Sequence, residues 1–140
     1  MSFREKSAWI SLLLYLGIYG FYFGQVAVAL TRGQADGAHF LGLFWQSVVM
    51  FVVATIVLTI IAAVLAPKDA QAPQDEREEL ITLKANSASG YVLASGVVLV
   101  IGAVFYGADE FLTVNLLFFA LVLSEVYKVA AQLALYRRGV

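Results

Sequence analysis

The segment FLGLFWQSVVMFVVATIVLTIIAAVL, residues 40–65, contains no charged side chain and is long enough to cross a lipid bilayer as a helix. A hydrocarbon core of about 30 Å needs about 20 apolar residues at a rise of 1.5 Å per residue. A single strand of this length would leave its backbone N–H and C=O groups unpaired in lipid, whereas a helix bonds them internally. The segment therefore predicts a transmembrane helix.

Three further apolar runs of similar length occupy residues 8–30, 85–106 and 112–135. Hydrophobic residues make up 61% of the chain and charged residues only 14%, well below the roughly one quarter that is typical of soluble domains. We therefore expect an all-α fold, a four-helix transmembrane bundle in which residues 1–140 form a single membrane domain. The segment 66–84 would be its one long loop.

The basic residues predict which ends of the helices face the cytoplasm. Only Arg32 lies in a loop on one side of the expected bundle. The other eight of the nine Lys and Arg residues lie on the opposite side or near it: Arg4, Lys6, Lys68, Arg77, Lys84, Lys128, Arg137 and Arg138. Because basic residues accumulate on the cytoplasmic side, both termini and the loop 66–84 should be cytoplasmic.

Charge and motifs exclude several classes of protein. A net charge of −1 with scattered basic residues argues against nucleic-acid binding, and the absence of Cys excludes disulfides and thiolate chemistry. The chain has no serine-hydrolase, zinc-protease or phosphate-loop motif, and His39 is its only histidine. We expect no enzyme, cofactor or metal site, and membrane lipids as the surroundings.

The loop 66–84 carries a candidate docking site. Pro67 should end the second helix, and Asp75 followed by Glu78 resembles a capping box, so a helix should begin near Asp75 and continue into the third span. About three turns would then project into the cytoplasm, where they form either a solvated helix start or a site for a cytoplasmic protein partner. The docking candidates are Asp75, Glu76, Arg77, Glu78 and Glu79.

Two charged residues lie within the fourth span. Glu125 and Lys128 are three residues apart and share a helix face that Gln132 continues. A charge inside a span costs about 2.5–3.5 kcal/mol on insertion scales, so the pair requires an explanation. The pair either has a structural role, in which it locks helix packing or snorkels to the inner interface, or it supplies a carboxylate that binds a proton or a substrate.

The first span has a polar face and a glycine face. Its tyrosines, with Gln25, should look inward because hydroxyl groups in hydrocarbon need hydrogen-bond partners, which Gln46, Ser47, Asn115 or Glu125 would supply. These side chains either line a ligand site or only fill space between helices. The candidate ligand or ion residues are Glu125, Lys128, Gln132, Asn115, Tyr15, Tyr19, Tyr22, Gln25 and Gln46.

The glycine face comprises Gly17, Gly20 and Gly24. The spacing Gly20-x-x-x-Gly24 lets two helix backbones approach closely, either within one protomer or between two copies. Because a single four-helix bundle has little interior, we expect a homo-oligomer and favour a dimer.

The juxtamembrane segments show a family resemblance. The opening Met1–Trp9, the run Asp75-Glu76-Arg77-Glu78 with Ile81 and Lys84-Ala85, and the ending Leu135–Gly139 resemble small bacterial inner-membrane proteins of unassigned function. The resemblance implies a multi-pass protein of the bacterial inner (plasma) membrane. It implies no substrate, cofactor or catalytic residue.

Two functional hypotheses remain open. The first is an interaction, sensory or regulatory protein that binds a partner through its cytoplasmic loop. The second is a small transporter or ligand-binding bundle that uses Glu125, Lys128 and the tyrosine face.

Overall fold

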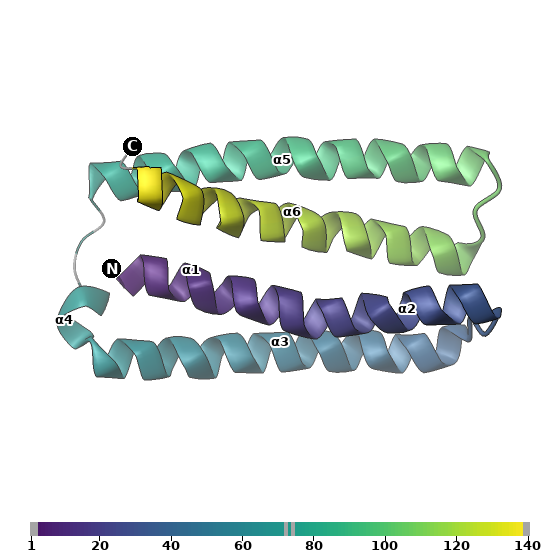
Figure 1. The fold of residues 1–140 in the computed structure, drawn as a ribbon, viewed down its shortest axis with the longest axis horizontal. Helices are drawn as coiled ribbons and strands as arrows, with labels where there is room; N and C mark the ends of the chain where they lie inside the picture. The colour runs from purple at the N-terminus through teal and green to yellow at the C-terminus, as the bar shows by residue number, and fades with distance from the viewer. Residues whose placement is uncertain (1–2, 72, 74, 139–140) are drawn as a thin grey trace.

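The computed structural model describes residues 3–71, 73 and 75–138, and this part of the chain is helical apart from its connections. The first rod is continuous and consists of α1 (Phe3–Leu14), the π-helical turn η1 (Tyr15–Tyr19) and α2 (Gly20–Arg32). The other elements are α3 (Gly37–Leu65), the short α4 (Pro67–Ala70), α5 (Glu76–Phe105) and α6 (Glu110–Arg138) (Figure 1). The rod, α3, α5 and α6 are each long and apolar enough to cross a membrane. The expected four-helix fold is confirmed.

The two short connections are closed by glycine and aspartate. Gly33 ends α2 in the left-handed conformation (φ 65°), which a residue without Cβ adopts at little cost. Asp36 then caps α3, because its Oδ1 accepts a hydrogen bond from Ala38 N at 3.1 Å. Between α5 and α6, the left-handed residue is Gly107 (φ 90°), one position beyond the C-cap Tyr106. Asp109 caps α6, because its Oδ1 accepts a hydrogen bond from Leu112 N at 2.7 Å.

The long connection agrees with the sequence in its boundaries but not in its capping. α3 ends at Leu65 and Pro67 opens α4, as expected for a residue that cannot continue a helix. α5 begins at Glu76 and runs unbroken into the membrane span. The capping box was a wrong prediction, because the Asp75 side chain makes no capping hydrogen bond. The backbone carbonyl of Asp75 instead accepts from Glu79 N at 3.0 Å.

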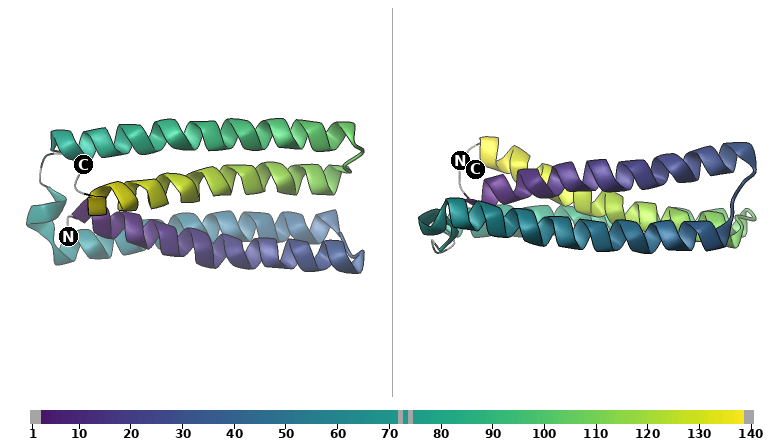
Figure 2. Two further views of the ribbon diagram at one scale, coloured as in Figure 1. Left: turned by 45° about the horizontal axis from the view of Figure 1, so that its top comes forward. Right: turned by 90° about the horizontal axis from the view of Figure 1, so that it is seen from below.

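The four long helices run along a common axis (Figure 2). Across the bundle they lie in the order α5, α6, first rod and α3, so α6 and the rod occupy the middle (Figure 1). One end of the bundle contains the start of α1, the short α4 and the end of α6, and we call it the terminal end. The opposite end, with the connections 33–36 and 106–109, is the loop end.

Two clusters of buried side chains lie near opposite ends of the bundle. At the loop end, Tyr22, Val26, Ala29 and Phe40 are surrounded by half-buried aromatic rings from α2, α3 and α6. Toward the terminal end, the second cluster packs α1 against α6 and contains Ala8, Val129 and Leu133. An 18-residue stretch of α3 has a mean hydropathy of 3.1, and large aliphatic side chains are exposed along the helix, which suits a helix surrounded by lipid.

Candidate functional site: a pocket at the loop end

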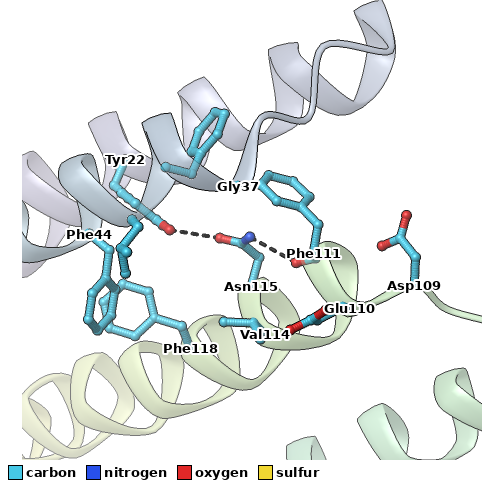
Figure 3. Close-up of a pocket in the computed structure, with 11 residues that line it drawn as sticks. Tyr22, Gly37, Phe44, Asp109, Glu110, Phe111, Val114, Asn115 and Phe118 are labelled. Atoms are coloured by element: carbon cyan, nitrogen blue, oxygen red, sulfur yellow. Dashed lines mark hydrogen bonds between the residues drawn. The ribbon is translucent and has the colours of Figure 1, made fainter.

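A pocket of about 650 Å³ opens between α3 and α6 at the loop end, and Tyr22 of α2 contributes to its lining (Figure 3). α3 supplies one wall and α6 supplies the other. The lining residues are Tyr22, Gly37, Phe40, Leu41, Phe44, Asp109, Glu110, Phe111, Val114, Asn115 and Phe118. Apart from Tyr22, they come from the first two turns of α3 and from the start of α6 with the loop residue before it.

A hydrogen-bonded pair of polar side chains lies in this pocket. Tyr22 Oη donates to Asn115 Oδ1 at 2.8 Å, and Asn115 Nδ2 donates to the carbonyl of Phe111 at 2.9 Å (Figure 3). Tyr22 is 5% exposed and Asn115 is 6% exposed. The two bonds fix the orientation of the amide and leave it one N–H and one oxygen lone pair for a further partner.

Aromatic rings hold the two walls together at one side of the pocket. Phe44 of α3 meets Phe118 of α6 edge to face at 4.8 Å between ring centroids, and Phe40 meets Phe111 at 5.2 Å. Tyr22 contacts the same Phe118 ring at 5.4 Å. Rings in such arrangements keep helix axes farther apart than small residues do, which leaves room for the hollow beside them.

The pocket carries negative charge where α6 begins. Asp109 uses Oδ1 to cap α6, so its other carboxylate oxygen has no part in the cap. Glu110 lies in the first turn of α6 and is exposed. Of the described residues that line the pocket, none is Lys, Arg or His.

The Glu125–Lys128 pair lies farther along α6 toward the terminal end. Lys128 Nζ bonds to Glu125 Oε2, and Tyr15 Oη donates to the same oxygen at 3.3 Å. The Tyr15 ring in turn packs on Phe51 of α3 at 4.4 Å. The side chains of Lys128 and Glu125 are 26% and 33% exposed. The carboxylate thus links α6 to the first rod, at the π-helical turn that Tyr15 opens.

The tyrosine face points into the bundle, as expected, and connects the two polar places. Tyr19 and Tyr22 are buried and Tyr15 is half-buried. The rings of Tyr15 and Tyr19 lie 5.9 Å apart, and Tyr19 meets Phe118 at 5.4 Å. A continuous line of aromatic rings therefore runs from Glu125 to the loop-end pocket.

Three other candidate residues lie apart from these places. The inward orientation of Gln25 was a wrong prediction, because its side chain is exposed. Gln25 and the exposed Gln46 lie beside a small hollow of about 60 Å³ between the first rod and α3. Ser47 next to them donates its hydroxyl to the carbonyl of Phe44 in its own helix. Gln132 is half-buried one turn beyond Lys128. The structure thus divides the predicted ligand set among separate places.

Two of the docking candidates interact with residues near the N- and C-termini of the same chain. Glu78 forms an ion pair with Arg4 at 3.2 Å, and Arg77 Nη2 donates to the carbonyl of Tyr136 at 3.3 Å. The carboxylate-bearing residues Asp75, Glu76 and Glu79 are exposed to solvent.

The glycine face is uncovered within the protomer. A Cβ added at Gly17, Gly20 or Gly24 would meet nothing within 4 Å, so packing of this face inside one protomer was a wrong prediction. Packing between copies stays a prediction. The close helix approach lies elsewhere, because a Cβ on Gly96 of α5 would come within 2.7 Å of the Ala120 Cβ of α6.

Sequence reasoning missed most of the pocket. It proposed Tyr22 and Asn115 but not the phenylalanines of the walls or the carboxylates of Asp109 and Glu110. A usable signal was present, since Phe40 and Phe44 share one helix face by their spacing of four. Within the part of the chain that the structure describes, no three His, Asp or Glu side chains gather closely enough to hold a metal ion.

No family model, no curated protein and no solved structure matches this chain. The resemblance to small bacterial inner-membrane proteins therefore stays a prediction. Any functional assignment has to come from the geometry of the bundle.

Proposed function

We propose that this small membrane protein is a non-enzymatic ligand-binding bundle whose site is the loop-end pocket. The observation that carries the proposal is a hollow of about 650 Å³ with aromatic walls and a fixed polar pair, Tyr22 and Asn115. Pockets for small molecules have volumes of about 300–1,000 Å³, mostly apolar linings and a few oriented polar groups. The ligand we propose is a small amphipathic molecule.

A purely structural role for the polar pair explains less. The Tyr22–Asn115 hydrogen bond satisfies a hydroxyl inside the bundle, which any membrane helix pair needs. That requirement does not account for the space beside the bond or for the amide's remaining N–H and lone pair. A bound ligand would fill that space beside the oriented amide.

We also propose that the protein is a multi-pass protein of a bacterial inner membrane with its terminal end in the cytoplasm. The support is the concentration of basic residues such as Arg4, Lys84 and Arg137 near that end, against Arg32 alone at the loop end. The pocket would then open toward the outer face of the membrane. Cysteine labelling at Ser2 and at Ala108 with a membrane-impermeant maleimide would test this, with Ala108 alone reacting in intact cells.

The exposed carboxylates of Asp75, Glu76 and Glu79 keep a second candidate function open, the binding of a cytoplasmic protein. Charge reversal of these three residues should then release that partner in pull-downs, while the Glu78–Arg4 ion pair remains. An unchanged set of captured proteins would remove this function.

A homodimer also remains part of the proposal, with the uncovered glycines of the first rod as its supporting feature.

The pocket is tested by filling it. Val114 lines the pocket and is 57% exposed, whereas Val98 of α5 lies outside it and is 67% exposed, so Val114→Trp and Val98→Trp form a matched pair. The probes are benzyltrimethylammonium and its uncharged isostere neopentylbenzene, and the measurement is the change in Tm in nanodiscs of zwitterionic lipid. A ligand that binds only the folded state raises Tm.

We expect at least one probe to raise the Tm of the wild type and of Val98→Trp, and to leave Val114→Trp unshifted. Equal shifts in all three proteins would mean that the probe acts through the lipid. That result, or no shift in any protein, would overturn the proposed site.

A further inference from the structure

We infer that the ligand of the loop-end pocket is an organic cation, an ammonium group carried on an apolar or aromatic body. The inference rests on the proposed function and specifies the ligand of the same site. Charge, ring chemistry and the hydrogen-bonding groups of the lining support it.

The charge of the pocket favours a cation. Among the described residues that line the pocket, three have ionisable side chains: Asp109, Glu110 and Tyr22. The first two are carboxylates and the third is a phenol. At the same end, Asp36 adds a third carboxylate against one arginine, Arg32. Apolar walls concentrate the field of charges at the mouth of a cleft, so an anionic ligand would be repelled there and a cation attracted.

The walls of the pocket suit the body of such a ligand. Phe40, Phe44, Phe111 and Phe118 line it together with Tyr22. A cation within about 6 Å of a ring centroid is attracted by the electrons of the ring face, and quaternary ammonium groups are commonly recognised by aromatic cages. An acyl chain would fill the same apolar space but would leave the carboxylates without a counter-charge.

The polar pair supplies further acceptors. Asn115 Oδ1 accepts one bond from Tyr22 and has a second lone pair, and the phenol oxygen of Tyr22 also accepts. A protonated amine can donate to these oxygens, while a quaternary ammonium would rely on the rings and carboxylates alone. The lining of the pocket thus includes two carboxylates, aromatic rings and two acceptor oxygens, all of which suit a cation.

The test compares two probes of the same shape and different charge. Equilibrium binding of benzyltrimethylammonium and neopentylbenzene is measured in nanodiscs of zwitterionic lipid, for the wild type and for the double variant Asp109→Asn/Glu110→Gln. Asparagine retains the cap of α6, so the fold is expected to persist. The control is Asp36→Asn, which removes one negative charge at the same end from a capping residue outside the lining.

We expect the wild type to bind the cation about tenfold more tightly than the neutral isostere. The double variant should lose most of this preference while its affinity for the neutral probe is unchanged, and Asp36→Asn should keep it. Raising the salt concentration should weaken binding of the cation only.

Each alternative outcome has a definite meaning. Equal wild-type affinities for the two probes would overturn the cation inference and leave the proposed pocket standing. A preference that survives in the double variant, or that Asp36→Asn removes equally, would overturn the assignment to Asp109 and Glu110. Binding of neither probe would overturn the proposed function itself.

Discussion

The two faces of α6 pack against their neighbouring helices in different ways. Toward α5, small side chains meet, and Gly96 lies so close to Ala120 that a Cβ at Gly96 would clash. Toward α3, bulky rings such as Phe111 and Phe118 meet their counterparts and a pocket of about 650 Å³ remains. We call the face toward α5 the closed face, because the two helices are in close contact there, and the face toward α3 the hollow face, because it borders the pocket.

The difference follows from the solvent. Lipid chains are as apolar as leucine, so burying apolar surface does not by itself draw helices together in a membrane. Small residues gain stability through close backbone approach, and this is the contact between α5 and α6. Aromatic pairs gain stability at ring separations that hold the helices apart, and the space left over becomes available to a ligand.

The largest predicted effect would break the closed face. Gly96→Leu must push α5 away from Ala120, and we expect the free energy of unfolding to fall by about 3 kcal/mol. Gly90→Leu on the same helix is the matched control, because a Cβ at Gly90 meets nothing within 4 Å. Unfolding titrations with sodium dodecyl sulfate in mixed micelles would measure both. Equal losses for the two variants would contradict the close approach.

The next effect concerns the hollow face. Asn115→Leu leaves the buried Tyr22 hydroxyl without its acceptor and should lower the free energy of unfolding by about 1–2 kcal/mol. Adding Tyr22→Phe to this variant should recover part of the loss, since the orphaned hydroxyl is then removed. Asn86→Leu, at an exposed position of α5, provides the control. If the double variant is no more stable than Asn115→Leu, the hydrogen bond does not contribute.

A smaller effect is expected farther along the same face, where Glu125 joins α6 to the first rod. A double-mutant cycle of Glu125→Gln and Lys128→Met should give a coupling of about 1 kcal/mol, limited because both side chains are partly exposed. Lys128→Met alone should cost more than the double variant, because it leaves the carboxylate unpaired apart from Tyr15. A coupling of zero would mean that the pair snorkels independently.

The smallest effect is expected at the terminal end, outside both faces of α6. Arg4→Gln removes the ion pair with Glu78, whose partners remain in contact with solvent, so the change should stay below about 1 kcal/mol. High salt should reduce even this difference. A loss as large as that of Asn115→Leu would show that the terminal end holds the bundle together more strongly than its exposure suggests.

Sequence reasoning reached the elements of the fold but only part of the site. The expected span 40–65 lies within α3, Pro67 ends that helix, and the helix that begins at Glu76 enters the membrane unbroken. The inward tyrosine face and its bonds to Asn115 and Glu125 were also predictable, because hydroxyls in lipid need partners. The glycine face of the first rod was wrongly predicted to pack within the protomer, since the close helix contact involves Gly96 of α5.

The pocket could not be predicted because its walls come from different helices. Phe44 and Phe118 are each an ordinary apolar residue of a membrane span, and only their meeting at 4.8 Å defines a wall. Asp109 in the sequence is a helix cap, and it becomes part of a site only through the position of α3.

What the amino-acid sequence determined by itself is the solvent, the number of long helices and the places where the chain reverses. Length, hydropathy and the residues Gly33, Asp36, Pro67 and Gly107 suffice for these, because each acts locally on the backbone. The tertiary structure alone decided which helix faces meet. In lipid any apolar face is nearly as stable against a hydrocarbon chain as against another helix, so pairing depends on shape, and shape is a property of two surfaces together.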